Sequence, residues 1–391
     1  MTISQLYLTL LRLSLFGGEA PAEMEQQLTS EALSLVARLA KSQDMGHLVF
    51  DALQTYYPHL QNEVISSLRQ QYMTAIFRNE CMTADLNNVC EILEKNAIPH
   101  LPLKGAIIRP YYKESWMRTS CDIDLLVREE DLKRAQAIIE NDLHFTLECG
   151  PNFHDVSLYS PSGTHLELHF SIKEGIAPID KILERVWEYA APVCDGSCRF
   201  LLSDDFLLFH LIAHTAYHFM HGGCGTKPFF DLYVLEKALP IKEEVFSAFL
   251  EESELLPFYQ NVRALMRVWF ENEPYTDFTR QMADYILRGG TYGSHRHSVA
   301  IQKNQQGGKL RFLLFRLFPP FDFLKLRYPT LKKLPFLAPI YYIRRLLSVL
   351  MPKRMCRSAN ALKISATLTK QEDNALNLLL NELGLKDFNT D

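Results

Sequence analysis

Asp122 and Asp124, two aspartates with one residue between them, begin an apolar stretch that ends at Val127. Alternate side chains of a β-strand point to the same face, so the two carboxylates would lie side by side, roughly 6 to 7 Å apart. Two unpaired negative charges at that separation repel by about 2 to 3 kcal/mol at an effective dielectric constant near 20. Mg²⁺, which prefers carboxylate oxygens and shares its other positions with water and phosphates, would relieve this repulsion. The bare spacing also fits two solvated acids at a strand end.

Basic groups precede this pair. Lys104 and Gly105 follow an apolar segment with strand character. A glycine lets the backbone approach a phosphate at a helix N-terminus, and the lysine ammonium adds a point charge. Arg118 lies four residues before Asp122. Its planar guanidinium could pair with triphosphate oxygens, or it could neutralise the two aspartates structurally.

A third acid occurs in a later alternating segment. His165, Glu167 and His169 alternate there with leucines and a phenylalanine, and Pro161, Ser162 and Gly163 supply the preceding turn. A strand with its apolar face inward would present Glu167 on the same side as the two histidines. Glu167 is therefore either a further ligand or an exposed glutamate on the face of a sheet.

The motif Leu103-Lys104-Gly105, followed by Arg118-x-x-x-Asp122-x-Asp124-Leu-Leu-Val, resembles the nucleotidyltransferase superfamily of DNA polymerase β. Within it, the chain is most similar to an uncharacterised bacterial nucleotidyltransferase family. The superfamily usually has Gly-Gly or Gly-Ser where this chain has Lys104 and Gly105, so its phosphate-holding serine has no counterpart here.

The resemblance implies a metal-dependent enzyme that transfers a nucleoside monophosphate from an NTP to an acceptor hydroxyl and releases pyrophosphate. Asp122, Asp124 and Glu167 would be the catalytic acids and would hold two Mg²⁺ (or Mn²⁺) ions that act on an in-line displacement. The acceptor stays open between a small molecule, a protein and RNA. The alternative is a non-catalytic binding module with the same fold, which would dock on a membrane or a partner through its basic C-terminal region.

The resemblance also implies which residues contact the nucleotide. Lys104, Gly105 and Arg118 would position the triphosphate, and Lys227 and Asp231 resemble a segment that closes the pocket. Lys227 could instead be an ordinary surface lysine.

Three histidines share one face of an expected helix over 206–220, at positions 210, 214 and 218. A zinc site is one interpretation, but no partner follows at a recognised spacing and the nearby cysteines, Cys194 and Cys198, are in a C-x-x-x-C arrangement. We therefore favour the interpretation that this face lines the nucleotide or acceptor pocket, as the resemblance implies.

The surrounding pattern predicts an α/β (α+β) fold, with a small mixed nucleotidyltransferase sheet between helical regions. Apolar residues at helical spacing predict a helical N-terminal region over 1–97. The catalytic core would occupy 98–192, a helical domain closing the nucleotide pocket 193–290, and a basic, aromatic-rich helical region 291–391. The length of 391 residues fits two or three domains.

The composition excludes no soluble enzyme class. The chain is 47% hydrophobic and 22% charged, with a formal charge of −5, so nothing global demands nucleic acid or disorder. The eight cysteines are scattered through apolar segments, which fits a reducing compartment. The N-terminus has the pattern of a helix rather than a signal peptide, and no long uncharged apolar run is present, so we expect a cytoplasmic protein.

Charge is concentrated near the C-terminus, where residues 303–357 contain 13 lysines and arginines but one acid, Asp322. Three interpretations compete for this segment: contact with RNA through phosphates and stacked bases, peripheral contact with an anionic membrane, or packing on the acidic remainder of the chain. An amphipathic helix is expected over 367–385, as a packing or dimer element. The oligomeric state is left open.

Overall fold

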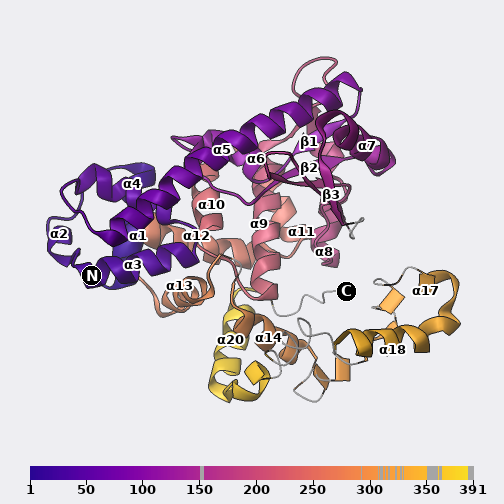
Figure 1. The fold of residues 1–391 in the computed structure, drawn as a ribbon. Helices are drawn as coiled ribbons and strands as arrows, with labels where there is room; N and C mark the ends of the chain where they lie inside the picture. The colour runs from indigo at the N-terminus through magenta and orange to yellow at the C-terminus, as the bar shows by residue number, and fades with distance from the viewer. Residues whose placement is uncertain are drawn as a thin grey trace.

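We describe the protein from a computed structural model. The structure describes residues 1–149, 154–291 and 293–306, and further on residues 308, 311–312, 314–315, 318–321, 324–325, 328, 330–349, 360 and 363–385. Helices surround a small mixed sheet, which confirms the expected α/β class (Figure 1).

The main sheet has five strands in the order β1-β2-β5-β4-β3. The central pair, β2 and β5, is parallel, and the other pairs are antiparallel. A short hairpin of two further strands lies next in sequence and had not been expected. The strands are β1 (His100–Pro102), β2 (Asp122–Val127), β3 (Thr146–Cys149), β4 (Asp155–Tyr159), β5 (His165–His169), β6 (Ala190–Pro192) and β7 (Phe200–Leu202).

One face of the sheet is apolar and packs on two helices, α5 (Glu63–Lys95) and α7 (Leu132–Leu143). Ile123 and Leu125 of β2 and Leu166 and Leu168 of β5 belong to this core. The alternation of a strand then sends the polar residues of both strands to the other face. Leu126, on that other face, belongs to a second, larger core.

The N-terminal helices are α1 (Ile3–Phe16), α2 (Met24–Gln27), α3 (Ser30–Ser42) and α4 (Gly46–Tyr56). Thr2 and Thr29 cap α1 and α3 by accepting backbone hydrogen bonds, and Asn62 does the same for α5. α5 is 33 residues long and runs from these helices to the sheet (Figure 1). These helices confirm the helical character expected for the N-terminal region.

Between the first two strands lie three short helical segments, α6 (Gly105–Ile108), η1 (Arg109–Tyr111) and η2 (Ser115–Met117). η3 (Glu129–Asp131) precedes α7, and η4 (Val186–Tyr189) precedes the hairpin. The helices that extend the larger core are α8 (Ala177–Leu183), α9 (Asp204–His221), α10 (Lys227–Ala238), α11 (Glu243–Glu252), α12 (Leu256–Phe270) and α13 (Asp277–Gly289).

The larger core combines residues from α1, α3 and α4 with residues from α9 to α13 and from the C-terminal α20 (Lys370–Glu382). The larger core therefore joins segments from both ends of the chain. The four domain boundaries expected from the sequence remain a prediction.

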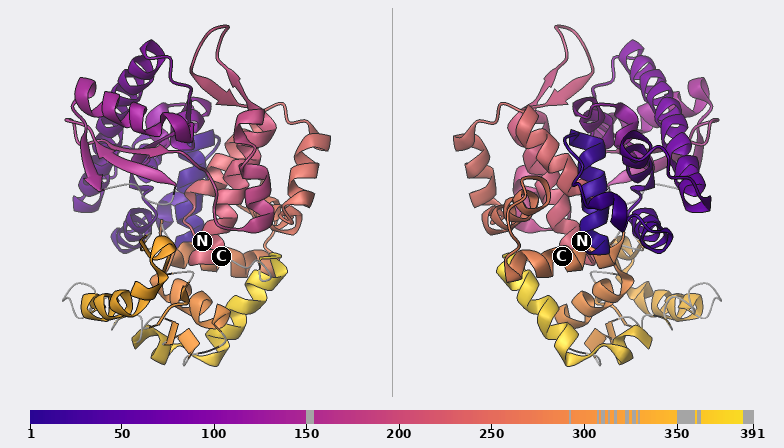
Figure 2. Two further views of the ribbon diagram at one scale, coloured as in Figure 1. Left: turned by 90° about the vertical axis from the view of Figure 1, so that its right-hand side faces the viewer. Right: turned by 90° about the vertical axis from the view of Figure 1, so that its left-hand side faces the viewer.

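The C-terminal helices lie together at one end of the molecule (Figure 2). α14 (His295–Gln305) packs on α20, where Arg296 pairs with Glu372 at 2.9 Å and Lys303 pairs with Asp373. α17 (Thr330–Lys333), η5 (Pro335–Leu337) and α18 (Ala338–Val349) represent the basic segment, which lies partly outside the described residues. None of the described helices has the length and apolar character needed to cross a lipid bilayer.

Candidate active site on the parallel strand pair

The predicted acids meet on the polar face of β2 and β5. Because the two strands are parallel and in register, Asp122 lies beside His165 and Asp124 lies beside Glu167. Asp124 is buried, while Asp122 and Glu167 are partly exposed. The structure thus brings together the three carboxylates that the sequence analysis placed on two separate strands.

Oxygen and nitrogen ligand atoms gather in two overlapping groups. Asp122, His165 and Glu167 form one group, and Asp124, Glu167 and His169 form the other, with the ligand atoms of each within 4.8 Å of one another. Glu167 is shared by both. The two histidines were not predicted as ligands, although their alternation with Glu167 already placed them on its face.

Asp124 already has two cationic neighbours on one oxygen. Its Oδ1 accepts from Lys104 Nζ at 2.8 Å and lies 3.0 Å from His169 Nε2. Burial would raise the pKa of Asp124, but Lys104 and His169 outweigh burial and hold this pKa far below its ordinary value. Burial would lower the pKa of His169, but its bonds to Asp124 and Glu167 raise that pKa to about 9.

Asp122 has weaker compensation, from the charges of Lys104 and His165. Burial, together with repulsion from Asp124 and Glu167, raises the pKa of Asp122 above its ordinary value. An additional positive charge at this position would lower the pKa and remove the repulsion. The carboxylate oxygens of Asp122, Asp124 and Glu167 are ligands that Mg²⁺ and Mn²⁺ prefer, so the residues present fit a divalent ion.

Lys104 reaches Asp124 from a backbone conformation that L-residues rarely adopt. Its φ is 44° and its ψ is −120°, at the junction between β1 and α6. Such a conformation costs on the order of 1–3 kcal/mol and persists where the surroundings enforce it. The Leu103 N–H donates to the carbonyl oxygen of Asp124 at 2.9 Å, which fixes the junction against β2.

Gly105 is required here by close approach. A Cβ added at Gly105 would lie 2.9 Å from Arg118 Nη1 and 3.1 Å from Ser120 Oγ. The missing side chain therefore makes room for the guanidinium of Arg118. Phosphate binding at Gly105 remains a prediction.

Arg118 is bound within the protein. Its Nη2 donates to Asp231 Oδ2 at 2.8 Å and its Nε donates to both carboxylate oxygens at 3.2 Å. Tyr112 Oη donates to Asp231 Oδ1 at 2.6 Å. Asp231 is 1% exposed. This pair of residues joins the loop before β2 to α10. Contacts of Arg118 and Asp231 with a nucleotide remain predictions.

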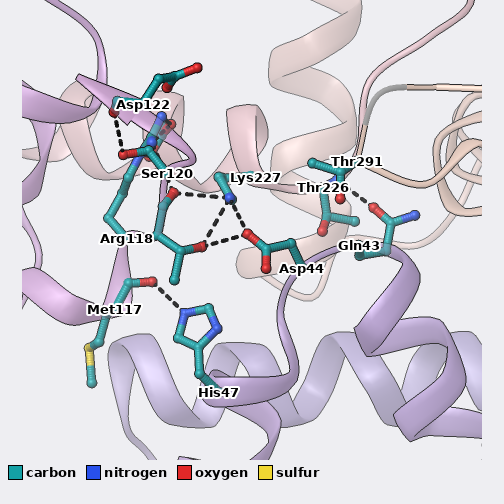
Figure 3. A network of polar contacts seen from close by, with 12 residues as sticks. Gln43, Asp44, His47, Met117, Arg118, Ser120, Asp122, Thr226, Lys227 and Thr291 are labelled. Atoms are coloured by element: carbon teal, nitrogen blue, oxygen red, sulfur yellow. Dashed lines mark hydrogen bonds and ion pairs between the residues drawn. The ribbon is translucent and has the colours of Figure 1, made fainter. Parts of the chain in front are cut away.

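Lys227 joins the same loop to the N-terminal helices (Figure 3). Its Nζ donates to Asp44 Oδ2 at 2.9 Å and to the carbonyl and hydroxyl oxygens of Thr119, both at 3.0 Å. These three acceptors can satisfy the three hydrogens of an ammonium. Contact between Lys227 and a triphosphate stays a prediction.

The histidine face of α9 contacts Glu174, and its predicted place in the nucleotide or acceptor pocket remains a prediction. His214 Nδ1 lies 2.7 Å from Glu174 Oε1, and His214 Nε2 lies 3.0 Å from His218 Nε2. Burial is the main cause that lowers the pKa of His210 and of His214 to about 3. The charge of Lys104 acts in the same direction on both, and His214 does so on His210. Glu174, which the sequence analysis did not single out, is therefore part of this polar face.

Zinc has no support at this helix. In the part of the chain that the structure describes, the groups able to hold a metal ion are the two on β2 and β5, and neither includes a histidine of α9.

The chain belongs to a family of nucleotidyltransferases. The model of this family, described as uncharacterised nucleotidyltransferase, matches residues 29–271. The matched range includes the acids of β2 and β5, Lys104 and the whole of α9 and α10. No curated protein and no solved structure shows significant similarity to the chain.

Proposed function

We propose that the protein is a metal-dependent nucleotidyltransferase that moves a nucleoside monophosphate from an NTP to an acceptor hydroxyl. The observation that carries this proposal is the meeting of Asp122, Asp124 and Glu167 on two parallel strands, with Glu167 shared between two ligand groups. Membership of the nucleotidyltransferase family supports the reaction class.

Asp122, Asp124 and Glu167 would hold Mg²⁺ or Mn²⁺. When bound, the ions would supply charge to the triphosphate and to the attacking oxygen. The acceptor oxygen forms a new bond to the α-phosphorus, the bond from this phosphorus to the bridging oxygen breaks, and pyrophosphate leaves.

Lys104, Gly105 and Arg118 would position the triphosphate. The Lys104 side chain is 24% exposed, and its ammonium contacts Asp124. Arg118 lies against Gly105, within the same corner. Lys227 and Asp231 would hold the wall of the pocket through Thr119 and Arg118.

Glu174, His214 and His218 would receive the proton of the acceptor. With Glu174 ionised, His214 Nδ1–H donates to the carboxylate, and His214 Nε2 is left as an acceptor for His218 Nε2–H. His218 Nδ1 then carries a lone pair. A proton taken at that atom can be passed through His214 to Glu174. Burial raises the pKa of Glu174 and lowers the pKa of both histidines, so Glu174 would hold the proton and the histidines would relay it.

Incubation of the protein with each labelled NTP, Mg²⁺ or Mn²⁺, and fractionated cell extract tests the proposal. We expect metal-dependent label in one fraction, and digestion of that fraction with nuclease or protease identifies the acceptor as RNA, protein or a small molecule. Asp122→Asn with Asp124→Asn should abolish labelling. Asp142→Asn, which changes an exposed acid of α7, should leave it intact.

A non-catalytic binding module is the second candidate, favoured by one observation. Lys104 and His169 already supply positive charge to Asp124 without a metal ion. Nucleotide binding that needs no metal and survives the double aspartate substitution, with no transfer to any fraction, would favour the module. For the enzyme we expect a cytoplasmic location, where NTPs are available.

A further inference from the structure

An apolar stripe faces outward on the C-terminal helices. Phe336 is 73% exposed, Ile340 60% and Ile343 58%. Intervals of four and three residues place these side chains on one side of η5 and α18, because neighbours at this spacing share a helix face. A stripe of three large apolar side chains on one exposed face is a feature that soluble surfaces seldom carry without a partner.

The opposite side of α18 is packed, so the outward direction of the stripe is fixed. The ring of Tyr341 lies 4.6 Å from that of Tyr328, and Tyr342 Oη donates to the carbonyl oxygen of Pro319 at 2.6 Å. Both tyrosines are partly buried. The helix therefore presents its aliphatic residues to the outside while its aromatic residues hold it on the neighbouring segment.

Positive charge flanks the stripe. Lys333 and Arg344 are exposed, and Arg344 lies over the ring of Tyr328 at 6.0 Å. The segment 303–357 as a whole has 13 basic residues and a single acid. α17 and α18 also lie at the edge of the molecule, away from the sheet, where a flat surface can reach them (Figures 1 and 2).

We infer that residues 330–349, the docking surface, bind an anionic lipid membrane. Phe336, Ile340 and Ile343 enter the boundary between headgroups and acyl chains, while Lys333 and Arg344 contact anionic headgroups. An amphipathic helix with an apolar face and basic flanks binds membranes in this way, through buried apolar area and attraction to anionic lipids together. The inference is independent of the proposed transfer reaction.

The charge and the side-chain types of this face favour a membrane over a second copy of the chain or RNA as its binding partner. A second copy of the chain would bring two basic segments together, and like charges repel. Single-stranded RNA binds through successive bases stacked on several aromatic rings, whereas the stripe has one ring, Phe336, beside two aliphatic residues, and Tyr341 lies against Tyr328. An anionic bilayer matches both the aliphatic residues and the positive charge.

Co-sedimentation of the full chain with vesicles tests the inference. We expect binding to vesicles of phosphatidylcholine with phosphatidylglycerol and little binding to phosphatidylcholine alone. High salt should weaken the binding, because the headgroup contacts are screened. The variant with Ile340→Asp and Ile343→Asp should bind the anionic vesicles about tenfold more weakly or worse, since it loses two apolar groups and adds two negative charges.

Leu378→Asp is the matched control, because Leu378 is 51% exposed on α20, outside the docking surface. It should bind like the unchanged protein, and circular dichroism should show both proteins folded. Absence of binding to anionic vesicles, or equal binding by the two-isoleucine variant, would overturn the inference. Loss of self-association in analytical ultracentrifugation, or of RNA binding in a gel shift, with vesicle binding unchanged, would assign the face to those partners instead.

Discussion

Two aspartates on one strand differ in their neighbours. Asp124 contacts Lys104 and His169, whereas Asp122 faces the charges of Asp124 and Glu167 with less compensation. The pKa values move in opposite directions for this reason, down for Asp124 and up for Asp122. Charge repulsion at Asp122 is therefore the part of the site that a divalent ion would relieve.

Asp122→Asn should stabilise the metal-free protein and remove its response to metal. The substitution deletes a carboxylate whose ionised form is disfavoured by burial and repulsion. Mg²⁺ at a hundred times its dissociation constant should raise the unfolding free energy of the unchanged protein by about 2.7 kcal/mol. Thermal melts with Mg²⁺ and with EDTA measure both effects. A variant that melts lower without metal, or still responds to Mg²⁺, contradicts the assignment.

Gly105→Ala should lower the unfolding free energy by about 1–3 kcal/mol, the usual effect of overpacking. The added Cβ would meet Arg118 Nη1 at 2.9 Å, and this guanidinium is fixed by Asp231 and the carbonyl oxygen of Thr119. Gly289→Ala at the end of α13 is the control, because its nearest neighbour is 3.6 Å away, and it should be neutral or stabilising. Denaturant unfolding compares the two, and equal effects would rule out the close approach as the reason for glycine.

At the scale of elements, the loop that leads into β2 is held from two sides. Arg118 and Tyr112 bind Asp231 of α10, while Lys227 of α10 binds Thr119 and Asp44. These bonds set the position of Asp122 because the loop ends directly before it. Such contacts support the acids without touching a ligand.

Asp231→Leu should cost about 3–5 kcal/mol of unfolding free energy, because it leaves the buried charge of Arg118 without its partner. Adding Arg118→Met should restore much of this loss, since both charges are then replaced by apolar groups. Asp284→Ala breaks an exposed pair with Arg288 and should cost less than about 1 kcal/mol. Urea unfolding of the four proteins tests this, and a double variant as unstable as Asp231→Leu would exclude a charge-pairing role.

The sequence predicted the elements that carry a long or regular pattern. α9, β2 and β5 lie close to the segments expected from the sequence, because their apolar residues repeat with helical or alternating periods. The hairpin of β6 and β7 was missed, since strands of three residues show no such period. Cys194 and Cys198 lie in the turn of this hairpin.

The site was predictable only where its residues share a strand or a helix face. Alternation indicated that Asp122 and Asp124 share one strand face and that Glu167, His165 and His169 share another, and the family resemblance paired the two strands. The partners of the basic residues were not predictable, because Asp44 lies 183 positions from Lys227 and Asp231 lies 113 from Arg118. Such pairings follow from the packing of whole helices.

At the scale of the whole molecule, unfolding free energy should fall as the pH is lowered. Burial lowers the pKa of His47 to about 4 and the pKa of His210, His214 and His218 to about 3. These groups stay neutral in the folded protein but take up protons near pH 6.5 when it unfolds, so stability is lost from about pH 6.5 toward pH 3. Each contributes a slope of at most about 1.4 kcal/mol per pH unit.

His210→Asn should reduce this slope by up to one proton equivalent, as measured by urea unfolding at several pH values. Other charges near the histidines modify the curve: the raised pKa of Glu174 opposes the trend, and the lowered pKa of Asp124 adds to it below about pH 4. An unchanged slope in the variant would show that His210 is not neutral in the folded protein.

α5 contributes to both cores, and this has a consequence for how the chain can be divided. Leu68, near its start, lies in the larger core, whereas Met82, Leu86, Val89 and Leu93 cover the apolar face of the sheet. A fragment that begins at residue 98 would lose this cover and leave the inner face of β2 and β5 in water. The shared helix should instead make both halves melt in one cooperative transition, so heat would destroy the sheet and the N-terminal bundle together.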